Sequence, residues 1–436
     1  MTGKAFVCRL SEPQKIEGAD NIVFVEVAGE TIITSVNNTE GTEGILFDCE
    51  SVIDSAFLSD HNLFRHSELN ADKDVVGYFE DSGRVRPLKL RGKKCSAFFM
   101  PLDDIKWNTD SVKVGDQIES LNSKPLCRKF VNTQEQGTGR KPGKAREILV
   151  PDFKEHFSTD QLERSWSAIK GDIPVIVSAK LHGTSCRCGF LPAKQSVPWY
   201  KRLFGIQPKT AYKFTVGSRR VVKYVEGADL ESKKSFYKDD IWTLASKKYF
   251  YDKLNKGETI YFEIVGYLPD GSAIMPGHKI EKLKPFMDKP VYKEWKNHYG
   301  TDIKFSYGCA PKEFKVFVYR ISYTTPDGFC FDLSWDHVKM RCQQLGVPTV
   351  PELCRISPPA DDRDCQELIS TEVETQKTAG NKFGIDYSRF KDTPIEGVCV
   401  RQDAGFVPTI LKSKTYEFKA LEGIIKETNS DIEENN

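Results

Sequence analysis

The sequence lacks the features that mark a secreted or membrane-bound protein. It has 436 residues and a formal net charge of +1, so no excess of one charge covers the whole chain. It contains no signal-peptide core and no apolar run of about 18 residues, the length that a membrane span needs. We therefore expect a soluble, intracellular protein of the cytoplasm or nucleus, without membrane partners.

The sequence also lacks paired cysteines. Twelve cysteines are present, but no Cys-x-x-Cys pair occurs. Cys186 and Cys188 are too close for a usual zinc pairing and are expected to fill one face of a strand. This pattern predicts reduced, mostly buried thiols, as in a reducing compartment.

Residues 1–120 are expected to form a β-rich domain. Short strands bounded by Gly, Asn and Asp are predicted at 5–8, 22–27, 31–34 and 44–47. Such spacing indicates a small barrel, for which an OB-fold is one option. Residues 121–150 are basic and rich in Gly and Pro, so we expect a flexible linker that simply joins two domains or also contacts phosphates.

One segment of the first domain, residues 84–94, alternates basic and apolar side chains. Leu88 and Leu90 are expected to face the core, which would turn the basic side chains outward. An outward row of cations is either an ordinary solvated strand face or a surface that binds RNA phosphates. The residues expected to bind RNA are Arg86, Lys89 and Arg91.

Residues 151–425 are expected to form the second domain, followed by an acidic disordered tail at 426–436. Helical spacing is found at 240–254, at 335–345 after a capping Ser334, and at 361–375. Residues 192–212 are polar and are expected to form a surface loop.

The most informative stretch is residues 180–185, Lys-Leu-His-Gly-Thr-Ser, between two strand-like runs. Gly183 lets the backbone approach a ligand closely, and Lys180 is a potential nucleophile if its amine is neutral. Further segments follow in a fixed order, all strand-like and carrying polar or aromatic side chains. They supply Arg219, then Glu263, then Phe317 and Tyr319, then Glu396, and finally Lys412 and Lys414.

In this order the segments resemble the covalent nucleotidyltransferase superfamily of polynucleotide ligases and RNA capping enzymes. DNA ligases and capping enzymes usually carry Asp at the place of His182, whereas Lys-x-His-Gly is similar to the RNA ligase 2-like and RNA-editing branch. Few residues follow Lys414, so the additional domain is expected in front. That layout resembles the Deinococcus-type and Naegleria-type RNA ligases.

The resemblance implies an α+β fold, with an N-terminal OB-fold barrel and an ATP-grasp-like ligase domain of antiparallel sheets and flanking helices. It implies an ATP-dependent RNA ligase that uses Mg²⁺ or Mn²⁺ and acts as a monomer in RNA repair. The expected substrate is RNA with 3′-hydroxyl and 5′-phosphate ends, in a nicked duplex or an RNA–DNA hybrid.

The resemblance also assigns roles at the phosphates. Lys180 would form a covalent lysyl-AMP, and the cations of Lys412 and Lys414 would lower its pKa and contact the α-phosphate. His182 would act on the pyrophosphate side or serve only in packing. Because these residues all lie in the second domain, attack on ATP is expected to need that domain alone.

The remaining roles concern the nucleoside and the metal. Glu263 would hold the ribose hydroxyls or a metal, or form only a salt bridge, and Glu396 would bind the divalent ion. Arg219 would reach the ribose or the RNA end. Tyr319 or its neighbour Phe317 would stack on adenine, although the family often has Asp at the next position, where this chain has Arg320.

Two other functions fit the same residues. One is a capping-type guanylyltransferase that uses GTP, against which His182 and the missing C-terminal OB domain argue. The other is a non-catalytic RNA-binding protein on a ligase fold, against which the complete set of lysines and glutamates argues. Covalent labelling by ATP, by GTP or by neither separates the three.

Overall fold

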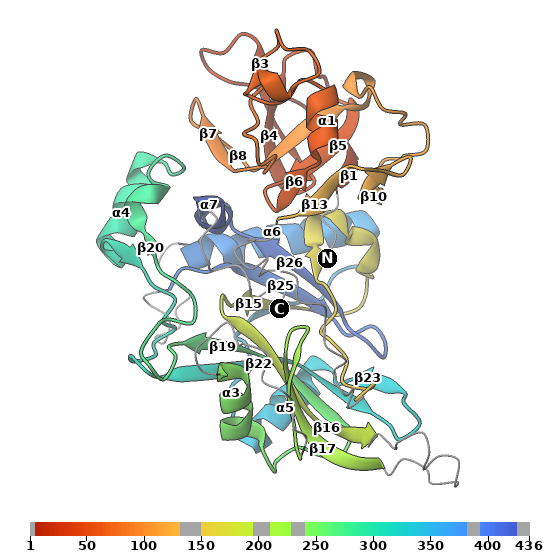
Figure 1. Ribbon diagram of the computed structural model, residues 1–436, viewed down its shortest axis with the longest axis vertical. Helices are drawn as coiled ribbons and strands as arrows, with labels where there is room; N and C mark the ends of the chain where they lie inside the picture. Colours follow the sequence, from red (N-terminus) through yellow and green to blue (C-terminus); the bar gives the residue numbers. More distant parts are fainter. Residues whose placement is uncertain (1–4, 131–149, 195–209, 228–239, 382–392, 425–436) are drawn as a thin grey trace.

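A computed structural model describes residues 5–130, 150–194, 210–227, 240–381 and 393–424. Three layers stack along the long axis of the molecule (Figure 1). The N-terminal strands lie at one end, a five-stranded sheet with helices α6 (Asp362–Asn381) and α7 (Tyr416–Ile424) lies in the middle, and a six-stranded sheet lies at the other end. The architecture is thus a mixed α/β fold built mainly on antiparallel sheets.

The N-terminal strands form several small sheets. The four strands predicted from the sequence are confirmed as β1 (Ala5–Arg9), β3 (Ile22–Val27), β4 (Glu30–Ser35) and β5 (Glu43–Asp48). The largest sheet has the order β10-β1-β5-β9, with β9 at Ala97–Pro101 and β10 at Gln117–Ile118, and a second contains β2 (Gln14–Lys15), β3 and β4. No closed barrel is seen among the described residues.

The start of the expected linker belongs to these strands. Strand β13 (Cys127–Lys129) pairs antiparallel with β6 (Ser51–Ile53). Residues 131–149, which hold most of the expected linker, and the expected tail at 426–436 lie outside the described residues. The expected surface loop is strand at both ends, because β16 (Thr184–Lys194) and β17 (Thr210–Ser218) extend into it, and its centre is likewise not described.

The expectation that Leu88 and Leu90 face the core is wrong. Strand β7 (Leu88–Leu90) pairs only with β8 (Lys93–Cys95), as a two-stranded hairpin whose turn has Arg91 at φ 47° and Gly92 at φ 80°. Both leucines are 43% exposed. Alternation predicts a buried face only where a second layer covers one side of the strand, and β7 is the outer strand of this hairpin, whereas β8 lies against β4.

The middle sheet has the strand order β14-β26-β25-β15-β24. Its strands are β14 (Asp160–Gln161), β15 (Val175–Lys180), β24 (Glu352–Ile356), β25 (Gly397–Gln402) and β26 (Thr409–Lys414). One face carries the apolar side chains of Val177, Val400 and Leu411, which pack with Ile369 and Val373 of α6. Because side chains alternate along a strand, the polar residues between them face the other side, toward the six-stranded sheet.

The six-stranded sheet has the order β18-β17-β16-β19-β22-β23. Its remaining strands are β18 (Val222–Val225), β19 (Glu258–Gly266), β22 (Phe314–Thr324) and β23 (Cys330–Asp332). Helices α3 (Ile241–Phe250) and α5 (Trp335–Leu345) pack on it through Trp242 and Val338 of the main hydrophobic cluster. Both helices were predicted, although α3 ends earlier than expected, and Gly346 ends α5 in a left-handed conformation.

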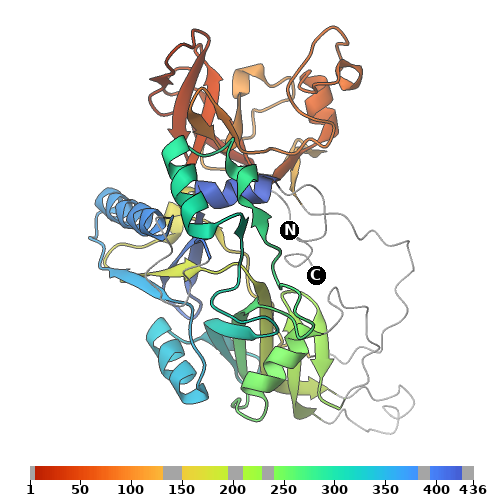
Figure 2. The same ribbon diagram turned by 90° about the vertical axis from the view of Figure 1, so that its left-hand side faces the viewer.

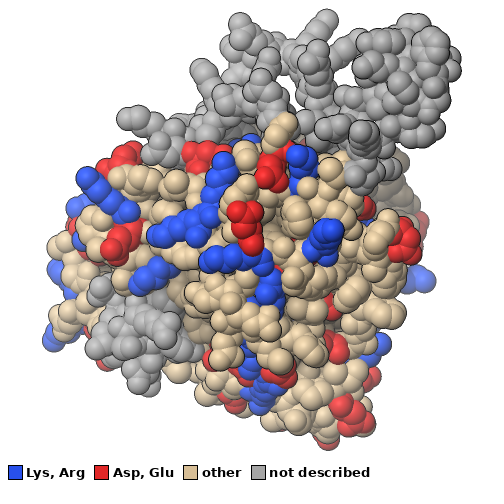
Figure 3. Space-filling model, turned by 90° about the horizontal axis from the view of Figure 1, so that it is seen from below, with Lys and Arg blue, Asp and Glu red and all other residues tan. Residues whose placement is uncertain are grey.

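Helix α4 (Lys289–Tyr299) was not predicted and lies beside α7 below the N-terminal strands (Figure 2). On the face remote from those strands, Lys and Arg are interspersed with Asp and Glu (Figure 3). This mixture agrees with the nearly balanced charge of the sequence. Among the described residues, no helix is both long and apolar enough to cross a membrane.

Candidate active site

The strand register of the middle sheet brings the candidate lysines together. Lys180 on β15 and Lys414 on β26 are both paired with Gly397 on the strand between them, β25. One step along, Cys399 of β25 is paired with Ser178 of β15 and Lys412 of β26. Side chains two residues apart share a face, so the three lysines form one cluster on the face opposite α6.

Gly397 makes this close arrangement possible. A Cβ atom at this position would lie 2.2 Å from the carbonyl oxygen of Ser413 and 2.7 Å from the Cα of Lys414. Side chains at the central strand would therefore push the flanking strands apart. A glycine here therefore allows β25 and β26 to pack closely, and Lys180 and Lys414 reach the same carboxylate, that of Glu396.

The cluster forms one wall of a cavity of about 500 Å³. The six-stranded sheet supplies a second wall through Ser185, Glu263 and Tyr319, and Arg219 follows β17. The N-terminal strands and their connections supply the third, including Glu50 and Lys129. Part of the cavity lining thus comes from the first 130 residues. The expectation that attack on ATP needs only the second domain did not include this contribution.

Lys180 pairs with the carboxylate of Glu396, whose Oε1 lies 2.6 Å from Nζ. Burial would raise the pKa of Glu396, but the charges of Lys180 and Lys414 more than offset this, so its pKa is lowered. The second oxygen, Oε2, is buried and has no hydrogen-bond partner. A buried carboxylate oxygen without a partner is costly unless a further cation or donor joins it.

His182 is held beside this pair. Its ring packs edge-on against Phe305 and Phe418, and its Nδ1 lies 3.8 Å from Oε2 of Glu396. The backbone N–H of His182 donates to the hydroxyl of Tyr307 at 2.6 Å. Burial lowers the pKa of the imidazole to about 3, with the charge of Glu396 opposing, so the ring is neutral at physiological pH.

Lys412 and Lys414 share a carboxylate that the sequence analysis did not identify. Glu50 lies 3.3 Å from Nζ of Lys412 and 2.9 Å from Nζ of Lys414. Lys414 also pairs with Glu422 of α7 at 2.8 Å and lies 3.6 Å from Glu396. Burial raises the pKa of Glu422 to about 7, although the charge of Lys414 acts against it.

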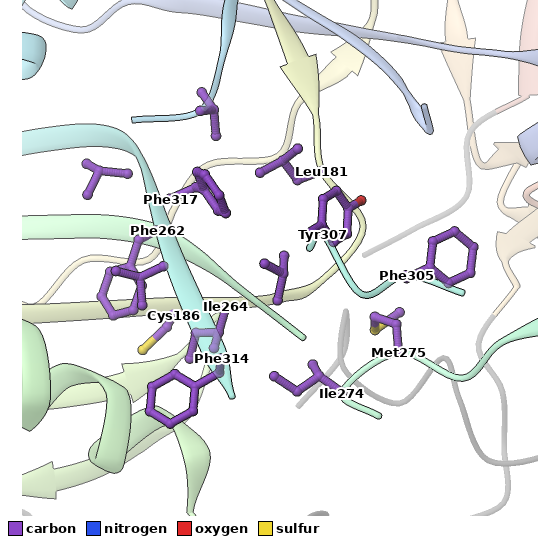
Figure 4. Packing of buried hydrophobic residues seen from close by; sticks show 14 of the residues in the cluster. Leu181, Cys186, Phe262, Ile264, Ile274, Met275, Phe305, Tyr307, Phe314 and Phe317 are labelled. Carbon is purple, nitrogen blue, oxygen red and sulfur yellow. The ribbon is translucent and has the colours of Figure 1, made fainter. Parts of the chain in front are cut away.

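The two candidate stacking aromatics separate in the structure. Tyr319 lines the cavity, and its hydroxyl lies 2.8 Å from that of Ser185. Phe317 is 2% exposed and packs in the core near Leu181 and Phe262 (Figure 4), outside the cavity lining. A register shift puts an extra residue, Tyr319, opposite the step from Tyr261 to Phe262, so the simple alternation that grouped the two aromatics is broken there.

Arg320 stands where the family often has Asp. Its contacts indicate a structural role. Its guanidinium forms two hydrogen bonds with the carboxylate of Asp332, one at 2.5 Å and one at 3.0 Å. It also lies over the rings of Phe157 and Tyr261. This arginine therefore joins β22 to β23 and fixes the strand that carries Tyr319.

Gly183 brings the backbone after Lys180 close to β19. A Cβ atom at Gly183 would lie 2.4 Å from the carbonyl oxygen of Ile264 and 3.0 Å from Cγ of Glu263. The glycine thus allows the loop after Lys180 to contact the strand of Glu263. The nucleophile candidate and this carboxylate consequently line the same cavity from two different sheets.

The three candidate RNA-binding residues lie outside the cavity lining. Arg86 and Arg91 are exposed. Lys89 instead contacts α4 and the residues before it, since its Nζ lies 2.6 Å from Oδ1 of Asp288 and 3.1 Å from the carbonyl oxygen of Met287. Its side chain is only 15% exposed.

The cavity lining includes charged or titratable residues that sequence reasoning did not single out, among them Glu50, His156, Arg164 and Glu422. Each lies outside the recognised segments, and contacts such as that between Glu50 and Lys412 join positions 362 residues apart. No local pattern marks such residues. The described residues also contain no group of three or more His, Cys, Asp or Glu placed to hold a metal ion.

The model of the family described as RNA ligase matches residues 173–420. Solved structures of Naegleria gruberi RNA ligase are similar over nearly their whole length. An apo aspartate-to-alanine variant has a TM-score of 0.55 and 14% identity, covering 96% of this chain and 98% of that chain. A lysine-to-alanine variant with ATP and Mn has a TM-score of 0.55 and 15% identity, covering 97% and 100%.

The same ligase with PPi has a TM-score of 0.53 and 16% identity, covering 95% of this chain and 97% of that chain. At these identities the likeness concerns the fold. None of the curated proteins matches the sequence significantly. The family model, however, covers more than half of the residues, including every strand that carries a cavity lysine of the middle sheet. The chain belongs to the RNA ligase family.

Proposed function

We propose that this chain is an ATP-dependent RNA ligase that joins a 3′-hydroxyl to a 5′-phosphate through a covalent lysyl-AMP on Lys180. The observation that carries the proposal is the cluster of Lys180, Glu396 and Lys414 across three adjacent strands at a cavity wall. Such a cluster offers a nucleophile, a carboxylate and a phosphate ligand within one small volume.

In the first step the amine of Lys180 attacks the α-phosphorus of ATP. The nitrogen–phosphorus bond forms, the bond between the α-phosphorus and the bridging oxygen breaks, and pyrophosphate leaves. The amine must lose its protons, and its contact with Glu396 at 2.6 Å supplies an acceptor close by. Lys412 and Lys414 contact the phosphate oxygens, where charge increases in the transition state.

Glu396 and Glu263 are the residues that would hold Mg²⁺ or Mn²⁺. The buried Oε2 of Glu396, which has no hydrogen-bond partner, fits a cation ligand. Magnesium keeps several waters and takes few protein carboxylates, so a larger cluster is not needed. A bound divalent cation would supply positive charge that favours the neutral form of the lysine amine and stabilises the α-phosphate.

The cavity also offers groups for the nucleoside. Tyr319 presents the aromatic surface for adenine, and its hydroxyl contact with Ser185 fixes the ring. Arg219 reaches the ribose or the RNA end. His182, neutral and held against two phenylalanine rings, lies where it can contact the pyrophosphate without adding a charge.

In the later steps AMP passes from Lys180 to the RNA 5′-phosphate, and a 3′-hydroxyl then attacks that phosphate and releases AMP. We assign the N-terminal strands, as an OB-like unit, to RNA binding, with Arg86 and Arg91 as exposed cations for backbone phosphates. Lys89 serves docking to Asp288 more than RNA binding. The substrate we propose is a nick in duplex RNA or an RNA–DNA hybrid, sealed by a monomer.

The test is incubation of the full chain with α-labelled ATP or GTP and a divalent cation, followed by a denaturing gel. We expect a covalent label from ATP and none from GTP. Label from GTP would indicate a capping-type enzyme. The absence of any label would leave only RNA binding and would overturn the proposal.

A further inference from the structure

One carboxylate of the N-terminal strands reaches the lysines assigned to the α-phosphate. Glu50 lies in the turn between β5 and β6, and its carboxylate is 2.9 Å from Nζ of Lys414 and 3.3 Å from Nζ of Lys412. A third cation, Lys129 of β13, lies 3.8 Å away. Three lysines from two distant parts of the chain therefore surround one carboxylate.

The turn that presents Glu50 is fixed from both sides. Asp48 accepts hydrogen bonds from the backbone N–H of Glu50 and the hydroxyl of Ser51, both at 3.0 Å. The other oxygen of Asp48 accepts from Arg164 of the second part of the chain at 2.7 Å. The backbone that presents Glu50 is therefore held in place, while the side chain beyond it can change direction.

The geometry of this cluster is that of an anion site shared by three donors. Lys412 contacts the two oxygens of Glu50 at 3.4 and 3.3 Å, and the distance to Lys129 is longer still. The one carboxylate thus meets the three ammonium groups at unequal distances, with its shortest contact to Lys414 at 2.9 Å. A phosphate group has more oxygens and more charge, and lysine binds phosphate as a point charge from many directions.

We propose that Glu50 is the counter-ion that the phosphates of ATP replace, and that Lys129 is a phosphate-positioning residue supplied by the N-terminal strands. The proposal rests on the assignment of this cavity to ATP. It makes the first 130 residues part of the nucleotide site, in addition to their role toward RNA. Lys412, Lys414 and Lys129 then share one anion in both states, the Glu50 carboxylate before the exchange and the phosphates after it.

The charge state of Glu50 supports this reading. Burial would raise its pKa, but Lys412, Lys414 and Lys129 lower it well below the ordinary value. Glu50 is therefore an anion at neutral pH. A bound triphosphate would meet it as a like charge within a few ångströms, so the carboxylate must turn away or lose its lysine contacts when the nucleotide enters.

The test uses the full chain and inorganic pyrophosphate without metal as the probe, with binding measured by calorimetry. Glu50→Gln removes the competing charge but keeps the side-chain size, so we expect pyrophosphate to bind about tenfold more tightly. Lys129→Gln removes a ligand, so we expect binding about tenfold weaker. The KM for ATP in self-adenylation should shift in the same two directions, with less change in kcat.

Matched controls lie on the same strands. Glu43→Gln alters an exposed carboxylate of β5 that pairs with Arg9, and Arg128→Gln alters the exposed neighbour of Lys129 on β13. Both should leave pyrophosphate binding unchanged. If the Glu50 variant does not fold, the comparison of pyrophosphate binding by Lys129→Gln and Arg128→Gln is sufficient to test the inference.

Unchanged or weaker pyrophosphate binding by a folded Glu50→Gln protein would overturn the inference, as would unchanged binding by Lys129→Gln. These outcomes differ from a failure of the proposed function. In that case the unaltered protein would form no covalent AMP at all, whatever its affinity for pyrophosphate.

Discussion

Lys180 and Lys414 flank Gly397 from the two neighbouring strands, and the same oxygen of Glu396 contacts both of their ammonium groups. Their strands are two strand spacings apart, about 10 Å, and both ammonium groups reach one carboxylate, that of Glu396, at 2.6 and 3.6 Å. Two like charges at this spacing repel each other unless an anion lies between them. The arrangement therefore suits a site that exchanges one anion for another.

Gly397→Ala should disturb this spacing directly. Its Cβ would lie 2.2 Å from the carbonyl oxygen of Ser413, so β25 and β26 would have to separate. A displacement of about 1 Å between reacting groups can cost on the order of a hundredfold in rate. We expect such a loss in self-adenylation, together with a lower thermal unfolding temperature. The control is Gly405→Ala, where a Cβ meets nothing within 4 Å.

Lys180→Ala should abolish covalent labelling by ATP, because no other residue can supply the nitrogen of the lysyl-AMP bond. Sealing of RNA that already carries a 5′-adenylate should persist in part, since that step bypasses the lysine. Lys170→Ala, at an exposed position, is the control and should label normally. Wild-type labelling of the Lys180 variant would show that the nucleophile lies elsewhere.

Lys412→Ala and Lys414→Ala should each slow self-adenylation by about a hundredfold, the effect of losing one charge-assisted phosphate contact in a closed site. Single-turnover rates with labelled ATP measure this. The Lys414 variant should also unfold at a lower temperature, because Glu422 and Glu50 lose a close partner. Normal adenylation by both variants would contradict their assignment to the phosphate.

A buried ion pair holds the N-terminal strands against α7. Both oxygens of Glu30 lie 2.8 Å from Nζ of Lys419, and the two residues are 3% and 8% exposed. Removal of either partner takes away a close contact of a buried charge, which costs about 1–3 kcal/mol here because Glu30 also pairs with Arg164 at 3.1 Å. We expect Lys419→Met and Glu30→Gln each to destabilise the protein, and the double variant to lose less than the sum. Additive losses in denaturant unfolding would show that the two do not interact.

The exposed arginines of the N-terminal strands should set the salt dependence of RNA binding. Arg86→Gln with Arg91→Gln should weaken binding and flatten its dependence on salt, because fewer counterions are released. Lys89→Gln should leave that slope nearly unchanged and should lower thermal stability instead, since its partner is Asp288. Filter binding of a nicked duplex over a range of salt concentrations distinguishes the two patterns.

Sequence reasoning succeeded where one local pattern determines one element. The strand ending at Lys180 follows from a short β-type run of apolar residues, and the last strand from an extended segment with Lys412 and Lys414 on one face. It failed where contacts with neighbouring strands or layers determine which side chains are buried. Leu88 is exposed because its strand is the outer one of a two-stranded hairpin, and the bulge at Tyr319 separates that residue from Phe317.

No local sequence pattern could predict the contacts between segments near the two ends of the chain. Glu50 is one acidic residue in a short turn, and its role depends on a fold that brings β26 beside it. Glu422 belongs to a helix that the sequence did not suggest. Residues that complete a site from a separate unit are found only once the units are placed.

Cys399 lies in the wall of this cavity, paired across the strands with Ser178 and Lys412. Burial raises the pKa of its thiol to about 11, although the charge of Lys180 acts in the opposite direction. Oxidants and alkylating reagents attack the thiolate, which is scarce at neutral pH under these conditions. We therefore expect the Cys399 thiol to react slowly with oxidants and alkylating reagents although it lies beside the lysines, and its rate of alkylation should report whether the cavity is filled.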